Sequence, residues 1–542
     1  MFDRKLPSVM KHDFSSIPRA EIQRSTFRRP YGYKTAFNEG DLIPIFIDEA
    51  LPGDTFTLNL SAVCRLATPI VPIMDNIFMD FHFFAVPNRL LWDHWVNFMG
   101  EKVNPSDTTE YEVPTIDTEA LPVEPGTLLD YMGIPPTFSG KAFSISALPV
   151  RCYQLIWNEW FRDQNLQYPV AFSSGDSPDL MSNVNVILKR GKRHDYFTSC
   201  LPWPQKGTGV ELPLGTTAPV YGNGKALGLT DGIINSGLAW SDSTGMVSRP
   251  AALGAEVGAV SGGTAPGWFT NDAIGVVTSA ANSGLIADLS NATAATINSL
   301  REAFQLQRLL ERDARGGTRY IEIINSHFGV QSPDARLQRP EYLGGGTMPV
   351  QINSVPQTGE TGTTPQGNLA AFGYAAGSGI GFSKSFTEHC IIMGLVSVRA
   401  DLTYQQGINR MWIRSTKYDY YWPALAHLGE QEVLSREIYV GDTAQDLSVF
   451  GYQERWAEYR YKPSLITGVL RSTHPTSLDV WHLSQEFSNR PVLNSAFIQE
   501  APPIARVVAV VNEPHFIFDG YFDLVCARPM PMYSVPGLID HF

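Results

Sequence analysis

Residues that could carry out catalysis are present, but none of them stands in a pattern typical of an active site. The chain has no H-E-x-x-H metal motif and no G-x-S-x-G turn that would present a serine nucleophile. Its eleven histidines are scattered singly. Three Gly-Lys pairs lack the upstream glycine and the following Ser or Thr of a phosphate-binding loop, namely Gly140-Lys141, Gly191-Lys192 and Gly224-Lys225. We therefore predict no enzyme activity, no metal site and no cofactor.

One cationic cluster does stand out, from Lys189 to His194. Its functional interpretation is a phosphate contact or a charged bridge to a neighbouring subunit, and the alternative is a solvated turn. We favour a structural role, because one short cluster neutralises few phosphates. Lys192 and Arg193 are the candidate residues of this cluster for an intersubunit or structural motif.

The N-terminal segment is basic, although the whole chain is acidic. Residues 1–34 hold eight Lys and Arg against three acids, whereas the formal net charge of the chain is −13. A basic arm on an acidic body indicates two faces in different environments. The candidate nucleic-acid-facing residues are Arg4, Lys5, Arg24, Arg28 and Arg29. A solvated tail is about equally compatible with this pattern.

The five cysteines are too far apart to form a zinc site or a C-x-x-C motif. Cys64, Cys390 and Cys526 lie inside apolar, strand-like runs. We predict that they are buried and reduced, as small hydrophobic residues. Reduced thiols fit assembly in a cytoplasm.

The elements that position these residues are predicted to be mainly strands. The chain of 542 residues has 46 Gly, 38 Pro and 18% charged residues, which favours turns and strands within one elaborated domain. Period-two alternation predicts strands at Thr55–Cys64 and Phe516–Cys526, and runs of β-formers predict two more at Ile77–Val86 and Cys390–Ala400. Strands at both ends of the chain imply non-local antiparallel pairing, which favours a jelly roll or a related sandwich.

Helices are expected to be few. Apolar spacing of three and four predicts one helix through Cys152–Phe161 and a second over Asn298–Asp313, ended by Gly316 and Gly317. Both are predicted to pack over sheets or against neighbouring subunits.

Two Gly-rich stretches are expected on the surface. Residues 207–291 are rich in Gly, Ala, Ser and Thr, yet they retain Trp240, Trp268 and Phe269. We interpret this stretch as an ordered insertion that needs partners to bury its apolar side. The second stretch, Gly344 to Gly381, is expected to be a long surface loop.

No membrane insertion is expected. The longest hydrophobic runs, Cys390–Val398 and Ile504–Val511, are too short to cross a bilayer. The first 29 residues are interrupted by charge and resemble no signal peptide, so secretion by that route is not expected.

Several motifs resemble the major capsid proteins of microviruses, especially the gokushovirus branch. The segments Lys189–Gly207 and Ile156–Asn165 are similar to signature regions of that family. Further similarity lies in Phe14, Arg28-Arg29-Pro30, Asp80–Arg89 and Gly316–Tyr320. The resemblance extends from residue 14 to the C-terminal strand, and residues 207–291 carry no recognisable family motif.

This resemblance implies an all-β, eight-stranded antiparallel jelly roll with long loop insertions and a few short helices. It implies a non-catalytic subunit of a T=1 icosahedral shell around circular single-stranded DNA, assembled in the bacterial cytoplasm and resident in the virion. The implied partners are other copies of the chain, the genome, an internal scaffolding protein, a minor pilot protein and a host receptor. The expected divisions are a basic arm (1–40), the first part of the jelly roll (41–206), the insertion (207–291) and the remainder (292–542).

The resemblance also suggests roles for aromatic residues. Trp240, Trp268 and Phe269 lie in the insertion, which matches the position of a protrusion at the threefold axes thought to meet the host. Trp157, Trp160 and Trp203 are candidates for an intersubunit or structural motif. The prolines on both sides of Trp203 fix an extended backbone. The Trp203 ring could then meet a neighbouring subunit or pack within its own subunit, and the two interpretations are equally weighted.

A rival from another class is a secreted, carbohydrate-active β-protein, either an enzyme or a lectin. This alternative predicts a signal peptide and sugar binding. The absence of a signal-peptide pattern argues against it.

Overall fold

The chain forms two compact units, Met1–Pro204 with Gly316–Phe542, and Gln205–Arg315. The computed structural model describes residues 23–102, 104, 106, 108–117, 123–136, 143–180, 185–210, 220–222, 229–230, 275–276, 285–287, 297–317, 319–329, 338–441 and 444–533.

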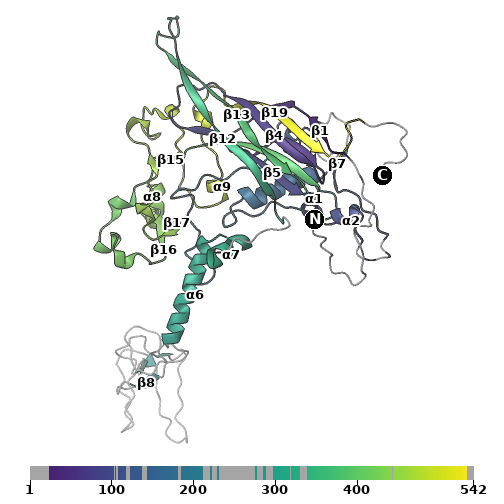
Figure 1. The fold of residues 1–542 in the computed structure, drawn as a ribbon. Coiled ribbons are helices and arrows are strands. Elements are labelled where there is room, and N and C mark those ends of the chain that lie inside the picture. Colours follow the sequence, from purple (N-terminus) through teal and green to yellow (C-terminus); the bar gives the residue numbers. More distant parts are fainter. Residues whose placement is uncertain are drawn as a thin grey trace, which may run out of the picture. The chain divides into compact units, whose positions relative to one another are not determined.

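The larger unit is built on an eight-stranded antiparallel jelly roll (Figure 1). One sheet has the order β2 (Tyr31–Phe37), β19 (Phe516–Arg528), β4 (Thr55–Leu66) and β13 (Leu369–Ser385). The other has the order β3 (Ile43–Ala50), β14 (Cys390–Ala400), β5 (Ile77–Pro87) and β12 (Glu341–Pro356). A short strand, β1 (Ser25–Arg28), also pairs with β19. The predicted fold class is confirmed.

The non-local pairing predicted from alternation is also present. β4 lies beside β19, with Cys64 opposite Phe518 and Leu60 opposite Phe522. Along β4, every second residue from Phe56 to Leu66 is buried. The two remaining predicted strands, β5 and β14, pair with each other.

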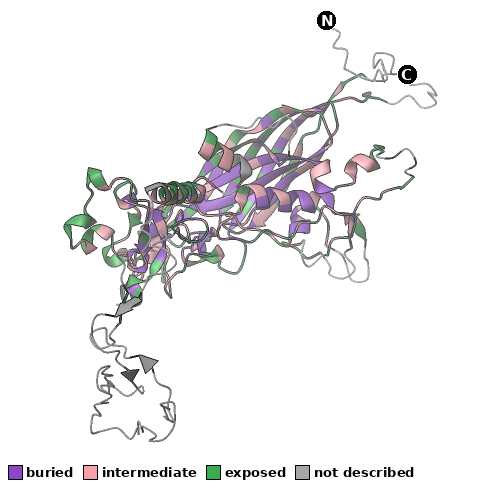
Figure 2. Ribbon diagram, turned by 90° about the horizontal axis from the view of Figure 1, so that it is seen from below, coloured by how far each residue is buried: buried purple, intermediate pink, exposed green. Residues whose placement is uncertain are grey.

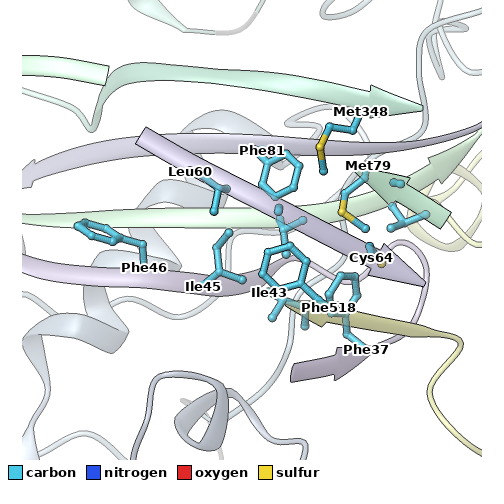
Figure 3. Close-up of a cluster of buried hydrophobic side chains, with 14 of the residues drawn as sticks. Phe37, Ile43, Ile45, Phe46, Leu60, Cys64, Met79, Phe81, Met348 and Phe518 are labelled. Atoms are coloured by element: carbon cyan, nitrogen blue, oxygen red, sulfur yellow. The ribbon is translucent and has the colours of Figure 1, made fainter. Parts of the chain in front are cut away.

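A hydrophobic core fills the space between the two sheets (Figure 3). Phe81 from one sheet and Phe518 from the other have ring centroids 6.1 Å apart. All five cysteines are buried and free, which confirms their predicted role as small hydrophobic residues. Burial alone raises the pKa of the Cys64 thiol to about 12, so that it stays protonated.

The expected loop from Gly344 to Gly381 was a wrong prediction, because most of this stretch forms strands β12 and β13. Gly345 and Gly381 are required by close backbone approach: a Cβ at these positions would lie 2.1 Å from the Phe81 oxygen and 1.9 Å from the Leu58 oxygen. Beyond the sandwich the two strands continue as a hairpin that pairs Gln351–Pro356 with Leu369–Tyr374 (Figure 1). Glycine here marks contact between strands and not a loop.

Helix α4 (Leu148–Ile156) continues into a π-helical turn, Trp157–Phe161, so the first predicted helix is confirmed. It covers the outer face of β5 and β14 through a second apolar cluster. Every residue of β14 is therefore buried, and Figure 2 shows burial concentrated in this part of the unit. Short helices elsewhere in the unit are α1 (Asn88–Leu91), α2 (Trp95–Phe98), α3 (Leu128–Tyr131), α7 (Tyr320–Phe328), α8 (Ser435–Ile438) and α9 (Ser495–Ile498).

Between β14 and β19 the chain makes a long excursion, residues 401–515, with a small core of its own. This third cluster gathers Tyr404, Val433, Ile438 and Phe450 with Tyr196 and Phe197. Its short strand pairs are β15 (Thr403–Tyr404) with β18 (Ser464–Leu465) and β16 (Glu430–Leu434) with β17 (Val449–Glu454). A further pair in the larger unit joins β6 (Thr115–Asp117) and β7 (Ser144–Ser146).

The smaller unit contains helix α6 (Ile297–Arg315), which confirms the second predicted helix. It ends directly before Gly316 and Gly317, and Gly317 has a φ of 92° that disfavours other residues. The described strands of this unit form two pairs, β8 (Val220–Gly222) with β11 (Leu285–Ala287) and β9 (Leu229–Thr230) with β10 (Gly275–Val276).

Candidate structural cluster and assembly residues

The cationic segment Lys189–Lys192 is tied into the sandwich by its backbone. The Arg190 amide donates to the Gly40 oxygen at 2.9 Å, and the Lys192 amide donates to the Ile498 oxygen at 2.7 Å. In return, the Glu500 amide donates to the Arg190 oxygen at 3.0 Å. The segment thus links the start of β3 to the chain that leads into β19.

One side chain of this segment, that of Arg190, meets a buried carboxylate, Asp80, on β5. Arg190 donates to Asp80 at 2.6 Å, and Arg399 on β14 donates at 2.7 Å. Thr347, which lies opposite Asp80 on β12, donates to its second oxygen at 2.7 Å. Burial alone would raise the Asp80 pKa, but the Thr347 hydrogen bond and the Arg190 charge outweigh it and hold the pKa below its ordinary value. We call these four residues the Asp80 cluster.

Glu500 is a second buried carboxylate near this cluster. One oxygen accepts the Ala400 amide at 3.4 Å, and the other has no hydrogen-bond partner among the described residues. Burial raises the Glu500 pKa to about 7, against the lowering effects of the Ala400 hydrogen bond and the nearby arginines. Glu500 is therefore part charged and part neutral near neutral pH.

A cavity of about 500 Å³ lies beside the cluster. It is lined by four Arg and Lys side chains, by two carboxylates (Asp163 and Glu322), and by aromatic and neutral polar side chains. Lys192 donates to Gln485 at 3.0 Å and lies 4.5 Å from the Phe497 ring centroid; burial lowers its pKa to about 8. His82, another lining residue, has its pKa lowered to about 4 by burial and then by the Arg190 charge. The lining provides cationic donors for an anion, but no nucleophile paired with a base. Arg193, in contrast, is exposed.

The two tryptophans of the π-helical turn have different environments. Trp157 is buried and donates to the Lys189 oxygen at 2.9 Å. Trp160 is 41% exposed, donates to the Pro340 oxygen at 3.0 Å and packs against Phe84 with centroids 5.5 Å apart. Trp157 therefore joins helix α4 to the cationic segment, whereas Trp160 is partly exposed and also contacts Tyr342 and Arg339.

Trp203 is half-buried, and its neighbourhood is fixed within the subunit. Leu201 and Tyr452 exchange two backbone hydrogen bonds of 2.8 Å, which attach the Pro-Trp-Pro segment to β17. These bonds fix the backbone before Trp203, and its ring remains a candidate both for packing within the subunit and for contact with a neighbour.

The described arginines of the basic arm are bound to the jelly roll. Arg28 pairs with Asp523 at 3.1 Å, and Arg29 pairs with Asp48 at 2.7 Å. Arg24 donates to the Thr55 hydroxyl at 2.8 Å. Because Arg28 and Arg29 already have carboxylate partners, they have less charge to offer to phosphates than the sequence suggested.

Other candidate residues lie outside the described part of the chain. These are Arg4 and Lys5 of the arm, and Trp240, Trp268 and Phe269 of the insertion.

Sequence reasoning missed the Asp80 cluster and Glu500. Asp80 stands in a strand-like run, and its partners Arg190 and Arg399 are 110 and 319 residues away. One signal was available: an acid inside an otherwise apolar strand, whose buried charge requires a partner.

The fold and this cluster define a class of protein. The two facing antiparallel sheets of the larger unit make it a jelly roll, the architecture of viral capsid, lectin and cupin domains. Among the residues described, no group of His, Cys, Asp and Glu could hold a metal ion. No helix in the described ranges is long and apolar enough to span a bilayer.

Comparison with known proteins identifies the family. The model of the capsid protein (F protein) family matches residues 15–538, and the chain belongs to this family. Similar relatives are capsid proteins VP1 of Bdellovibrio phage phiMH2K (48% identical, covering 98% of both chains), Chlamydia phage 1 (42%, 99% of both) and Spiroplasma virus 4 (40%, 97% of both). The predicted resemblance to microvirus major capsid proteins is thereby confirmed. Members of this family are structural proteins and not enzymes, which decides against the carbohydrate-active alternative.

Proposed function

We propose that the chain is the major shell subunit of a microvirus, assembling into a T=1 icosahedral capsid around circular single-stranded DNA. The observation that carries this proposal is the jelly roll with the order β2-β19-β4-β13 and β3-β14-β5-β12, in a chain whose family match covers residues 15–538. Closed shells need rigid subunits that present the same contacts repeatedly. The Asp80 cluster and the two cores supply that rigidity.

The proposed partners are other copies of the chain, the genome, an internal scaffolding protein, a minor pilot protein and a host receptor. Assembly takes place in the bacterial cytoplasm, and the protein resides in the virion. The insertion, residues 207–291, is assigned to host attachment, with Trp240, Trp268 and Phe269 contributing to packing at a threefold axis. Its low charge and its three large aromatic residues support this assignment.

For the basic arm we propose a divided role. Arg24, Arg28 and Arg29 anchor the arm on the sheet, as their contacts with Thr55, Asp523 and Asp48 indicate. Arg4 and Lys5 face the DNA. Lys192 and Arg193 serve the subunit structure and its contacts, as do Trp157, Trp160 and Trp203.

Variants of the arm test its DNA role. Replacing Arg4, Lys5, Arg24, Arg28 and Arg29 by Gln should lower genome packaging while empty shells still form, because phosphate neutralisation is lost. Arg4→Gln with Lys5→Gln should reproduce most of this loss, whereas Arg28→Gln alone should not. DNA content of purified particles is the measurement. Unchanged packaging in the five-residue variant would make the arm purely structural.

A further inference from the structure

Besides Tyr461 (45% exposed), six large aromatic side chains lie exposed on the excursion between β14 and β19. We call them the aromatic patch: Trp412 (71% exposed), Tyr418 (60%), Tyr420 (52%), Tyr459 (52%), Trp422 (50%) and Tyr421 (48%). Single exposed apolar residues are ordinary, but a group of this size on one segment is not.

Ring contacts, cations and one hydrogen bond link five of these side chains to their neighbours, and Trp412 lies near them in the sequence. Arg414 lies 4.3 Å from the Tyr459 centroid and 5.4 Å from the Tyr420 centroid. Tyr421 and Tyr459 have centroids 6.4 Å apart. Lys417 lies 5.0 Å from the Tyr418 centroid, and its backbone oxygen accepts the Trp422 indole N–H at 2.8 Å.

The patch is held in place before any partner binds. The Asp419 carboxylate accepts the Thr416 and Ser415 amides, and these hydrogen bonds lower its pKa to about 2. Beneath the rings, Trp456 packs edge-on against Tyr421 with centroids 5.6 Å apart. Preorganised rings lose little conformational entropy on binding.

Backbone strain points to the same place. Trp456 has a φ of 71°, and it is the one residue other than glycine with positive φ in the described ranges. Such a conformation is unfavourable by itself and persists where the surrounding structure requires it, often at functional surfaces. The Trp456 ring is buried, and its indole N–H donates to the Leu425 oxygen at 2.9 Å, so contacts around the ring maintain this conformation.

Three of the arginines around the patch are already paired with carboxylates. This pairing leaves Lys417 and Arg455 as its cations without an ion pair among the described residues, and it favours a protein partner over a nucleic acid. Aromatic rings beside arginines also occur in single-stranded DNA sites, which need free cations for the phosphates. Here Arg414 pairs with Glu458 at 3.2 Å, Arg410 pairs with Glu437 at 3.0 Å, and Arg460 pairs with Glu454. Neutralised arginines beside Trp and Tyr are typical of the centre of a protein interface.

We infer that the aromatic patch is a contact between subunits and that its partner is a second copy of this chain. The inference rests on the proposed assembly function and names the surface through which assembly proceeds. Six aromatic side chains of about 150–250 Å² each, roughly half exposed, present on the order of 500–800 Å². That area is comparable with the roughly 800 Å² that each partner buries in a stable interface.

Photo-cross-linking in assembled particles tests the inference. A benzoylphenylalanine probe at the position of Tyr418 should cross-link to a second copy of the chain, and mass spectrometry should locate the contact. The matched probe at Tyr168, which is 94% exposed and outside the patch, measures background. Cross-links to DNA or to another protein, or a yield no higher than at Tyr168, would overturn the inference.

The second measurement is the subunit concentration required for assembly of a double variant that carries both Trp412→Ala and Tyr418→Ala. The double variant should fold with an unchanged melting temperature, while the subunit concentration required for assembly rises by at least about tenfold. Tyr168→Ala should leave that concentration unchanged. Normal assembly of the double variant would overturn the inference about the patch and leave the proposed function intact. Failure of the unmodified chain to form shells would overturn the proposed function itself.

Discussion

Asp80 shows how a buried charge can serve structure instead of chemistry. Its carboxylate joins β12, β5 and β14 through Thr347 and Arg399, and it fixes the cationic segment through Arg190. Both arginines and Asp80 itself are nearly removed from solvent. Removing one partner from such a cluster leaves uncompensated charge inside the protein.

We expect Asp80→Asn to destabilise the subunit by about 3–5 kcal/mol, because Arg190 and Arg399 would lose their common carboxylate. The matched control is Asp519→Asn, whose ion pair with Lys34 at 3.1 Å is exposed. That control should cost no more than about 1 kcal/mol. Denaturant unfolding of the soluble subunit provides both values, and equal losses would contradict the assigned role of Asp80.

Glu500 makes stability depend on pH. Its folded pKa of about 7 lies above the ordinary 4.5, so the folded state holds a proton that the unfolded state releases. The stabilising effect of protonation is present below pH 4.5 and is lost as pH rises toward 7. The Glu500→Gln variant should lack this dependence, because its amide does not titrate. Between pH 4.5 and 7 the unmodified chain should therefore lose about 3 kcal/mol of unfolding free energy relative to the variant. A constant difference between the two proteins over this range would show that Glu500 does not titrate there.

At the scale of elements, the sandwich depends on glycine where its strands approach closely. Gly381 on β13 faces the backbone of β4, so any side chain there meets the Leu58 oxygen. Gly362, in the connection between β12 and β13, has no atom within 4 Å of the position that a Cβ would take. The same substitution should therefore be destabilising at Gly381 and nearly neutral at Gly362.

Gly381→Ala is expected to destabilise the fold by about 1–3 kcal/mol or to prevent soluble expression, because β13 must shift away from β4. Gly362→Ala should change stability by less than about 0.5 kcal/mol. Thermal unfolding followed by circular dichroism compares them. If both variants melted with the unmodified chain, the close approach at Gly381 would be refuted.

The sequence predicts some elements better than others, for physical reasons. β4 and β19 are half-buried, so their alternation is visible, and α4 and α6 show helical spacing. In β12 and β13, glycines stand where side chains would leave no room for the neighbouring strand. These glycines interrupt the alternation of apolar and polar residues by which strands are predicted. The Asp80 cluster and the aromatic patch depend on residues brought together from distant segments, which no local pattern reports.

At the scale of the whole molecule, assembly and attachment are assigned to different parts of the chain. The sandwich strands, the Asp80 cluster and the aromatic patch belong to the larger unit, and residues 207–291 lie within the smaller one, Gln205–Arg315. Deleting residues 207–291 should therefore impair host attachment more than folding of the jelly roll. Adsorption of variant particles to host cells, compared with the yield of soluble subunit, is the measurement. Loss of soluble subunit would contradict this division.

The central claim is that this jelly roll is a shell subunit. Electron cryomicroscopy of particles purified after co-expression with the scaffolding protein tests it most directly. We predict closed icosahedral shells with one copy of the chain in each asymmetric unit and the aromatic patch covered by a neighbouring copy. A protein that stays monomeric beside its scaffolding partner would contradict the claim.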